Sequence, residues 1–288
     1  MRAVLKHELS SYFTNLSGYV FGAFLLLFAG IYTMVYNIQS ATTNFEYVLG
    51  GMSFVFLVIV PILTMRALAE ERRQKTDQLL YSLPLTMTQV VIGKYIAMLI
   101  IFAVPLLIIS VYPVVLTAFG NIHLPAAFSA IVGFFFLGAA LIAIGMYISS
   151  VTESQAVAAG ICFVVMLVNY FIADLASMAS TTAFGSLFAL VILALVVSAV
   201  VYLMTKSGFA ALMCAAVLTG SIMLVYIFNS SVFEGLFPEI MENISLFERF
   251  YALIEGVFDL RNIVYFISFI GVFLFLSVQS MEKRRWSE

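Results

Sequence analysis

Long apolar runs recur along the chain, and they constrain its fold more than any other feature of the sequence. Runs of about 18 or more residues are long enough to cross a hydrocarbon core of about 30 Å as an α-helix. Such runs stand at approximately residues 18–37, 52–69, 93–118, 127–149, 156–175, 183–204, 209–228 and 262–280. A membrane β-barrel would instead show segments of about ten residues with alternating polarity. The sequence therefore predicts an all-α polytopic membrane protein with about eight transmembrane helices.

The composition excludes a water-soluble globule. Charged residues make up 10% of the chain and hydrophobic residues 64%, whereas about a quarter of the residues of a soluble domain are charged. Too little polar surface remains to cover a soluble fold. The net charge of −2 argues against a nucleic-acid partner. Both cysteines, Cys162 and Cys214, stand in apolar runs, and we interpret them as reduced packing residues.

The distribution of basic residues predicts the orientation in the membrane. With the N-terminus in the cytosol, all but two of the 13 lysine and arginine residues fall on the cytosolic side, as the positive-inside rule requires. The two exceptions, Arg249 and Arg261, stand in the longest outer loop. An even number of spans returns the C-terminus to the cytosol. We therefore expect both termini to be cytosolic.

The predicted spans lack the polar groups that an autonomous pump or enzyme needs. No ionisable residue stands near the middle of a span, which disfavours an ion-coupled carrier, although a sodium site built from backbone carbonyls stays open. The sequence has no Gly-x-x-x-x-Gly-Lys-Ser/Thr phosphate loop, no cysteine pair at metal-binding spacing and no set of nucleophile and base. We expect no enzymatic activity, cofactor or metal on this chain, and an energy source on another chain.

The first 17 residues predict a helix at the membrane surface. Apolar residues follow the helical repeat i, i+4, i+7, i+8 and i+11 at Leu5, Leu9, Tyr12, Phe13 and Leu16. A span follows at once, so we expect this helix to lie in the cytosolic interface. A leader exposed to water is the alternative.

A charged island interrupts the apolar chain at residues 66–92. It opens with seven charged residues within twelve positions: Arg66, Glu70, Glu71, Arg72, Arg73, Lys75 and Asp77. These charges end the second span near Leu68 or Ala69, and we expect its helix to continue into the cytosol because no proline or glycine follows before Pro84. A short apolar stripe then follows at helical spacing: Thr76, Leu79, Leu80 and Leu83. Its leucines either fold back onto lipid headgroups or fill a groove on a partner.

The island resembles a region of a known family. The segment EERRQKTDQLLYSLPLTMTQVVIGKY, residues 70–95, is similar to the coupling-helix region of ABC-2-type transporter permeases. That region has a charged run, then Glu/Asp-x-Leu-Leu, a Ser-x-Pro turn and a Gly-Lys before the next span. The corresponding positions here are Asp77–Leu80, Ser82–Pro84 and Gly93–Lys94, and Lys75 stands where the family commonly has glycine.

Two further segments resemble one subgroup of that family. Residues 7–32 and 247–286 are similar to the opening and the ending of permeases related to those of gliding motility. The family core has six spans, so we interpret residues 183–228 as an insertion of two spans.

The resemblance implies a fold and a function. The fold would be that of a type V exporter, and the chain would be a permease subunit in the plasma membrane of a bacterium, paired with a second copy or a paralogue as a dimer. It would export a substrate with ATP and Mg²⁺ held by a separate nucleotide-binding ATPase subunit. The coupling helix that docks on this ATPase would present Thr76, Asp77, Leu79, Leu80 and Leu83. A charged collar beside it would consist of Glu70, Glu71, Arg72 and Arg73.

Two T-x-x-Q sequences have the pattern of a capping box. Thr86 and Gln89 predict the start of the helix that forms the third span. Thr152 and Gln155 repeat the pattern after the fourth span, and Glu153 stands at the predicted helix start, where an acidic side chain suits the helix dipole. This second turn is either a plain connection or a minor contact with the ATPase.

Polar residues on the outer side leave several alternatives open. Asn169 and Tyr170 are the most polar pair in the fifth span, and they either line a transport pathway or form hydrogen bonds between helices. Residues 229–261 mix acidic and apolar side chains. The resemblance implies short re-entrant helices there that cap the pathway, and an outer loop that binds an extracytoplasmic accessory protein is the alternative.

The sequence thus predicts one transmembrane permease domain, residues 1–288, surrounded by membrane lipid. Two other functions stay open. One is an ABC-type complex that does mechanical work on outer partners without transport. The other is a membrane scaffold or ion-coupled carrier unrelated to ABC transporters. The sequence does not identify a substrate.

Overall fold

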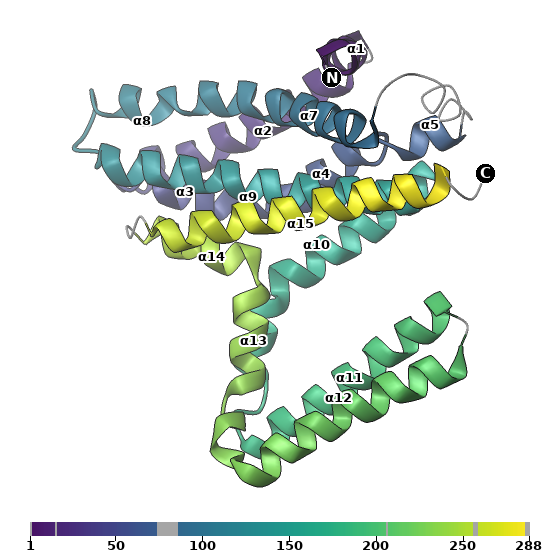
Figure 1. The fold of residues 1–288 in the computed structure, drawn as a ribbon. Helices are drawn as coiled ribbons and strands as arrows, with labels where there is room; N and C mark the ends of the chain where they lie inside the picture. Colours follow the sequence, from purple (N-terminus) through teal and green to yellow (C-terminus); the bar gives the residue numbers. More distant parts are fainter. Residues whose placement is uncertain (1, 15, 74–85, 206, 256–258, 286–288) are drawn as a thin grey trace. The chain divides into compact units, whose positions relative to one another are not determined.

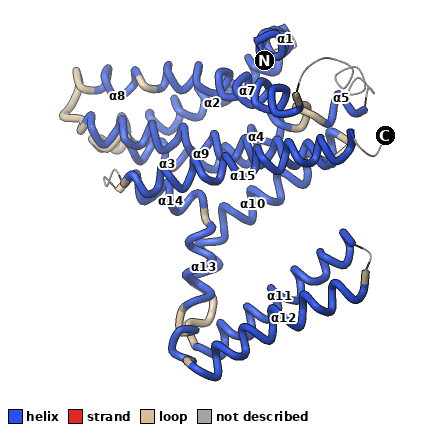
Figure 2. Tube along the Cα trace, viewed as in Figure 1, coloured by secondary structure: helices blue, strands red, loops and turns tan. Residues whose placement is uncertain are grey.

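The structure, a computed structural model, describes residues 2–14, 16–73, 86–205, 207–255 and 259–285. Within these ranges the chain forms helices joined by short loops, and no strand is present (Figure 2). The all-α prediction is therefore confirmed. The chain divides into two compact units, the first made of residues 1–168 and 249–288 and the second of residues 169–248. That these form one permease domain stays a prediction.

Most of the predicted spans are helices that are long and apolar enough to cross a membrane. Among the described residues there are seven: Ser17–Gln39, Glu46–Arg73, Met87–Leu116, Leu124–Val151, Gln155–Met178, Gly208–Phe228 and Leu260–Lys283. The remaining predicted span, 183–204, coincides with α11 (Ala183–Thr205), of which Ala183–Ala199 is a shorter apolar helix. The structure supports a multi-pass membrane protein.

The first unit contains most of the helices (Figure 1). It begins with α1 (Arg2–Thr14), α2 (Ser17–Thr33) and the π-helix η1 (Met34–Gln39). The second span consists of α3 (Glu46–Met52), the 3-10 turn η2 (Ser53–Val55), α4 (Phe56–Thr64) and α5 (Ala69–Arg73). Next come α7 (Met87–Ile109), α8 (Val111–Leu116), α9 (Leu124–Val151) and the first part of α10 (Gln155–Met178). The unit closes with the end of α14 (Leu246–Ile254) and with α15 (Leu260–Arg285).

Helix α9 forms the centre of the first unit, where it packs against α3, α4, α7 and α15. Gly138 on α9 allows two aromatic rings to approach closely, because a Cβ atom there would lie 3.0 Å from Phe56 Cε1 and 2.5 Å from Phe102 Cε1. The rings of Phe56 and Phe134 pack with their centroids 4.5 Å apart. All three phenylalanines are fully buried. These aromatic contacts lie in the core of the first unit, where the apolar spans meet.

A second close approach joins α4, α9 and α10. A Cβ atom on Gly145 of α9 would lie 2.9 Å from both Cβ and Cγ2 of Thr64 on α4. The Thr64 hydroxyl donates to the Val60 carbonyl oxygen and lies 3.8 Å from the Cys162 sulfur on α10. Both Thr64 and Cys162 are buried, so the prediction that Cys162 is a packing residue is confirmed.

The helix predicted at the N-terminus is present but shorter than the apolar stripe, and its place at the membrane surface stays a prediction. It is α1, and it packs against α7 and α2. Of the stripe, Tyr12 is buried and Phe13 is 39% exposed. Leu16 was wrongly assigned to the helix, because it follows the end of α1 with a left-handed φ of 59° and stays exposed. The chain turns sharply there and enters α2.

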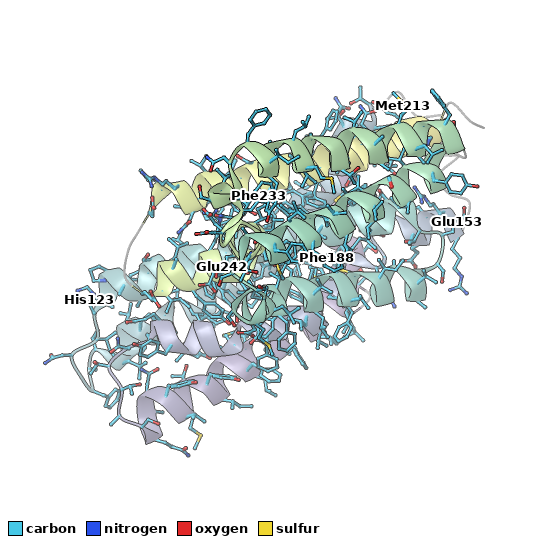
Figure 3. All side chains as sticks on the ribbon, turned by 90° about the horizontal axis from the view of Figure 1, so that it is seen from below. His123, Glu153, Phe188, Met213, Phe233 and Glu242 are labelled. Atoms are coloured by element: carbon cyan, nitrogen blue, oxygen red, sulfur yellow. The ribbon has the colours of Figure 1, made fainter. Side chains whose placement is uncertain are left out.

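The second unit is built on a helical hairpin. Helices α11 and α12 (Gly208–Phe228) pack side by side, and the Ser207 hydroxyl caps α12 by accepting from the Ala210 backbone N–H. Figure 3 shows Met213 and Phe233 at opposite ends of this hairpin. No described residue of α12 is buried.

The predicted outer region, residues 229–261, contains short helices. The 3-10 turn η3 (Ser230–Phe233) and α13 (Leu236–Ile244) pack against α11. Helix α14 follows, and its buried residues fall on one face: Leu246, Phe247, Phe250, Leu253 and Ile254. The helices agree with the predicted arrangement, and their re-entry into the membrane stays a prediction.

Candidate functional site

One end of the first unit gathers the charged residues that the sequence singles out. Helices α1 and α5, the start of α7 and the last turn of α15 lie at this end (Figure 1). The turn between α9 and α10 lies there too, since the Ser280 hydroxyl of α15 donates to the Ser150 carbonyl oxygen at 3.2 Å. Figure 3 shows Glu153 at this end and His123 at the opposite end of the unit. We call this region the charged end and define it by Glu8, Glu70, Glu71, Arg72, Arg73 and Lys94.

Lys94 on α7 is the centre of the charged end. Its Nζ atom lies 2.7 Å from Glu8 Oε1 on α1 and 2.8 Å from Glu71 Oε1 on α5. The Lys94 side chain is 4% exposed, so both contacts are made in an environment largely free of water. Ionic hydrogen bonds of this length are the strong class of hydrogen bonds in proteins. A single ammonium group therefore joins three elements that are far apart in the sequence.

The local sequence explains why α1 presents Glu8 to Lys94. Glu8 stands three residues after Leu5 and four before Tyr12, so all three share one helix face. Tyr12 is buried, and its hydroxyl donates to the Leu63 carbonyl oxygen on α4 at 3.2 Å. Burial raises the pKa of Tyr12, and the neighbouring Glu8 carboxylate raises it further, so the hydroxyl keeps its proton as a donor. The pairing of Glu8 with Lys94 was not predicted; the available signal was a carboxylate that shares a helix face with Leu5 and Tyr12 of the predicted apolar stripe.

The predicted charged collar forms α5, and it contacts two other elements. Glu71 contacts Lys94, and Arg72 Nη1 donates to the Thr152 carbonyl oxygen at 3.1 Å. Arg73 is exposed. The collar is therefore attached both to the third span and to the turn after the fourth.

The collar does not continue α4 as a regular helix, which corrects one expectation. Helix α4 ends at Thr64, and α5 begins at Ala69 after a turn. The buried Ser149 hydroxyl on α9 accepts from the backbone N–H groups of Leu68 and Ala69 at 3.1 Å and 3.0 Å. These two N–H groups would otherwise bond to carbonyls of the preceding turn in a continuous helix. Ser149 thus holds a bend that the sequence analysis did not predict.

Replacing Ser149 with alanine should destabilise this bend. The substitution leaves two buried N–H groups without their acceptor, and each unsatisfied buried group costs about 1–3 kcal/mol. We expect a loss of about 2 kcal/mol in the free energy of unfolding in detergent, with faster amide exchange in residues 65–73. Ser150→Ala is the matched control, because the Ser150 hydroxyl bonds only locally, to the Tyr147 carbonyl oxygen. Equal effects of the two substitutions would contradict the assignment.

The predicted capping box at Thr152 and Gln155 is wrong. The Thr152 backbone N–H and hydroxyl both donate to the Ile148 carbonyl oxygen, so that Thr152 ends α9. Helix α10 begins only at Gln155. A threonine hydroxyl can bond back by four residues, and here this bond competes successfully with the cap. A contact of Thr152, Glu153 and Gln155 with an ATPase stays a prediction.

The other predicted capping box is confirmed at its first residue. Thr86 precedes α7 with extended backbone, and its hydroxyl accepts from the Gln89 backbone N–H at 3.3 Å. The predicted coupling-helix residues lie outside the described residues: Thr76, Asp77, Leu79, Leu80 and Leu83. In the sequence they stand between Arg73, the last residue of α5, and Thr86, which precedes α7.

The predicted pathway residues Asn169 and Tyr170 brace the junction between α13 and α14 in the second unit. The Asn169 side chain accepts from the Leu246 backbone N–H at 3.1 Å and donates to the Ile244 carbonyl oxygen at 3.3 Å. The Tyr170 ring packs edge-on against Phe247. The alternative of hydrogen bonding between helices therefore has direct support, and a role in a pathway stays a prediction.

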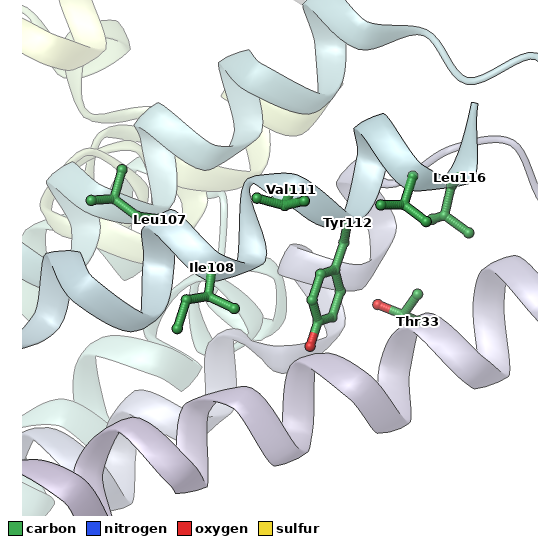
Figure 4. Close-up of a pocket in the computed structure, with 7 residues that line it drawn as sticks. Thr33, Leu107, Ile108, Val111, Tyr112 and Leu116 are labelled. Atoms are coloured by element: carbon green, nitrogen blue, oxygen red, sulfur yellow. The ribbon is translucent and has the colours of Figure 1, made fainter. Parts of the chain in front are cut away.

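An apolar groove opens in the first unit between α2 and the α7–α8 segment (Figure 4). Its volume is about 550 Å³, and it is lined by Thr33, Leu107, Ile108, Val111, Tyr112, Val115 and Leu116. The Thr33 hydroxyl is satisfied by the Ala29 carbonyl oxygen. Tyr112 extends from α8 toward α2. The groove extends to both sides of the helix break at Ser110, and its lining carries no charge that would select a ligand.

Comparison with known proteins gives one match. A family model described as ABC-2 family transporter protein matches residues 2–185, which is nearly two thirds of the 288 residues. The matched part contains α1 to α10 and every residue of the charged end, and it stops where α11 begins. A comparison with curated proteins gives no match.

Proposed function

Because the chain belongs to the ABC-2 family of transporter proteins and is the membrane permease subunit of an ABC transporter, we propose that it exports a substrate with ATP hydrolysed by a separate ATPase subunit. The observation that carries the proposal is the charged end within the matched residues. There a buried lysine joins the N-terminal helix, the collar and the third span. A junction of helices at this end can pass the motion of a docked ATPase into the membrane.

The ATPase docks on the coupling helix in this proposal. Leu79, Leu80 and Leu83 fill a groove on the ATPase, with Thr76 and Asp77 beside them, by the helix-in-groove mode. The collar holds the base of the coupling helix against α7. ATP and Mg²⁺ are bound by the ATPase, and the permease supplies the path through the membrane.

The proposed orientation places the charged end in the cytosol of a bacterial cell. Helix α1 and the end of α15 lie at the same end of the first unit, which supports two termini on one side of the membrane (Figure 1). Lys94 and the collar arginines lie at that end as well, in agreement with the positive-inside rule.

The proposed assembly is a dimer of two permease copies or of this chain with a paralogue, together with two ATPase subunits. We interpret α11 and α12 as an addition to the family core, which is supported by the end of the family match at residue 185. Membership of the subgroup related to gliding motility, and an outer accessory protein, remain part of the proposal. The family membership argues against a scaffold or carrier unrelated to ABC transporters.

Co-purification tests the ATPase partner. We expect an ABC ATPase to copurify with the tagged wild-type chain from native membranes, with ATP hydrolysis in the eluate. Replacing Leu79 and Leu80 together by glutamate should lower its recovery at least tenfold, because two buried apolar anchors would become charged. Thr43→Glu with Asn121→Glu is the matched control, since it adds the same charge in two exposed loop positions at the opposite end of the unit.

Two results would contradict the proposal. One is the absence of any ATPase beside the wild-type chain, and the other is undiminished recovery with the paired leucine substitution. Transport is tested by reconstitution with the recovered ATPase. ATP hydrolysis without movement of any candidate substrate would favour mechanical work over export.

A further inference from the structure

The ion cluster at Lys94 contains more negative groups than positive ones. One ammonium group serves two carboxylates, Glu8 from α1 and Glu71 from α5. With all three groups ionised, the cluster carries one excess negative charge. Loss of either carboxylate contact leaves Lys94 with one glutamate partner, whereas loss of the lysine removes the ammonium group that both carboxylates contact.

The two carboxylates differ in their access to water. The side chain of Glu8 is 13% exposed and that of Glu71 is 22% exposed, while Lys94 is 4% exposed. A carboxylate that leaves the cluster must be solvated again, because an isolated buried charge is costly. Glu71 is nearer to water and can leave at lower cost than Glu8.

The two helices that carry these carboxylates also differ in length and in the elements to which they are attached. Helix α1 has 13 residues, packs against α7 and α2, and is held by the bond from Tyr12 to the Leu63 carbonyl oxygen. Helix α5 has five residues, and two further bonds tie it to α9 and the turn after it rather than to α7: Ala69 N–H donates to the Ser149 hydroxyl, and Arg72 Nη1 donates to the Thr152 carbonyl oxygen. If Glu71 releases Lys94, these two bonds can keep α5 on α9 while it moves away from α7.

We propose that Lys94 is a positioning residue with one fixed partner, Glu8, and one releasable partner, Glu71. The collar can then leave α7 while α1 remains attached, and Lys94 keeps one carboxylate partner during the movement. The proposal rests on the proposed function only for the force that moves the collar, which would come from the docked ATPase. The unequal attachment itself belongs to this chain alone.

Amide hydrogen exchange of the full chain in lipid nanodiscs tests the assignment without an ATPase. Glu71→Gln should speed exchange in the collar and the turn before it, residues 66–73, roughly tenfold to a hundredfold, as expected for loss of a hydrogen bond to a charged group. Exchange in α1 should stay unchanged, because Glu8 retains Lys94. Each substitution leaves a neutral pair, so the variants are expected to fold.

Glu8→Gln provides the sharper test, because its two effects have opposite signs. It should speed exchange in α1 and slow exchange in the collar, since Glu71 becomes the sole carboxylate partner of Lys94. A merely structural role would speed exchange in both segments. Lys6→Gln and Arg73→Gln are the matched controls, because both side chains are exposed on the same two helices.

Two results would overturn the proposal. One is a Glu71→Gln variant that releases α1 as much as the collar, which would show a single cooperative unit. The other is a Glu8→Gln variant in which the collar exchanges as fast as in the wild type or faster. If no ATPase copurifies but the exchange pattern holds, the proposed function fails and the unequal attachment stands.

Discussion

Gly145→Leu should prevent the chain from reaching a stable fold. A Cβ atom at this position would lie 2.9 Å from Thr64 Cβ, an atom fixed to the backbone of α4 rather than to the end of a flexible side chain. Thr64 is completely buried, so α4 and α9 would have to separate. Overpacking of a core costs typically about 1–3 kcal/mol of stability and sometimes more. A leucine placed against an atom that is fixed to the backbone should cost about 3 kcal/mol or more. We expect loss of the monodisperse peak in fluorescence-detected size-exclusion chromatography, or a large drop in its thermal midpoint.

Gly271→Leu on α15 is the control for that substitution, because a Cβ atom at Gly271 would meet nothing within 4 Å. It should leave the thermal midpoint nearly unchanged. Adding Thr64→Gly to the Gly145→Leu variant should recover part of the loss, since it restores room at the crossing. A stable Gly145→Leu protein would show that α4 and α9 do not approach as described.

Lys94→Met should be the most damaging single change at the charged end. It keeps the length of the side chain but leaves the carboxylates of Glu8 and Glu71 without the ammonium group that both contact. Removing one partner of a buried ion pair costs about 3–5 kcal/mol. We expect a loss of that size in the free energy of unfolding, measured by denaturant titration in detergent micelles.

The triple variant Glu8→Gln, Glu71→Gln and Lys94→Met tests whether the lost stability comes from unpaired charge or from the changed shape of the side chain. It removes all three charges together, and replacing a complete buried ion cluster by neutral groups is often neutral for stability. The triple variant should therefore recover most of the stability that Lys94→Met loses. Lys6→Met is the control, because Lys6 is exposed on α1. If the triple variant is no more stable than Lys94→Met, the charges do not determine the effect.

The spans could be predicted from the sequence because each is a continuous apolar run, and its signal is local. The bend before the collar could not be predicted in the same way. The hydroxyl that holds it belongs to Ser149, and it bonds to the N–H of Leu68, 81 positions earlier in the chain. No local pattern in residues 65–69 indicates such a partner, and helix propensity alone favours continuation.

The site was predicted in part for the same reason. The collar was found from its density of charge, but its tie to α1 depends on Glu8 and Lys94, which are 86 positions apart. Asn169 was noticed as a polar residue in a span, and its actual partners are backbone groups near Leu246. At Thr152 the sequence pattern fitted two local bonds equally well, and the bond back to Ile148 is the one that forms.

The separation between Glu8 and Lys94 also sets an order of assembly. Glu8 is synthesised long before its counterion, and at about 5–20 residues per second the ribosome needs roughly 4–17 seconds to reach Lys94. The Leu63 carbonyl that accepts from Tyr12 also comes later. During that interval the Glu8 carboxylate lacks the Lys94 ammonium group, which lies 2.7 Å from it in the folded chain. Helix α1 therefore docks only after the start of the third span has emerged, and the first helix of the chain is among the last of its neighbours to settle.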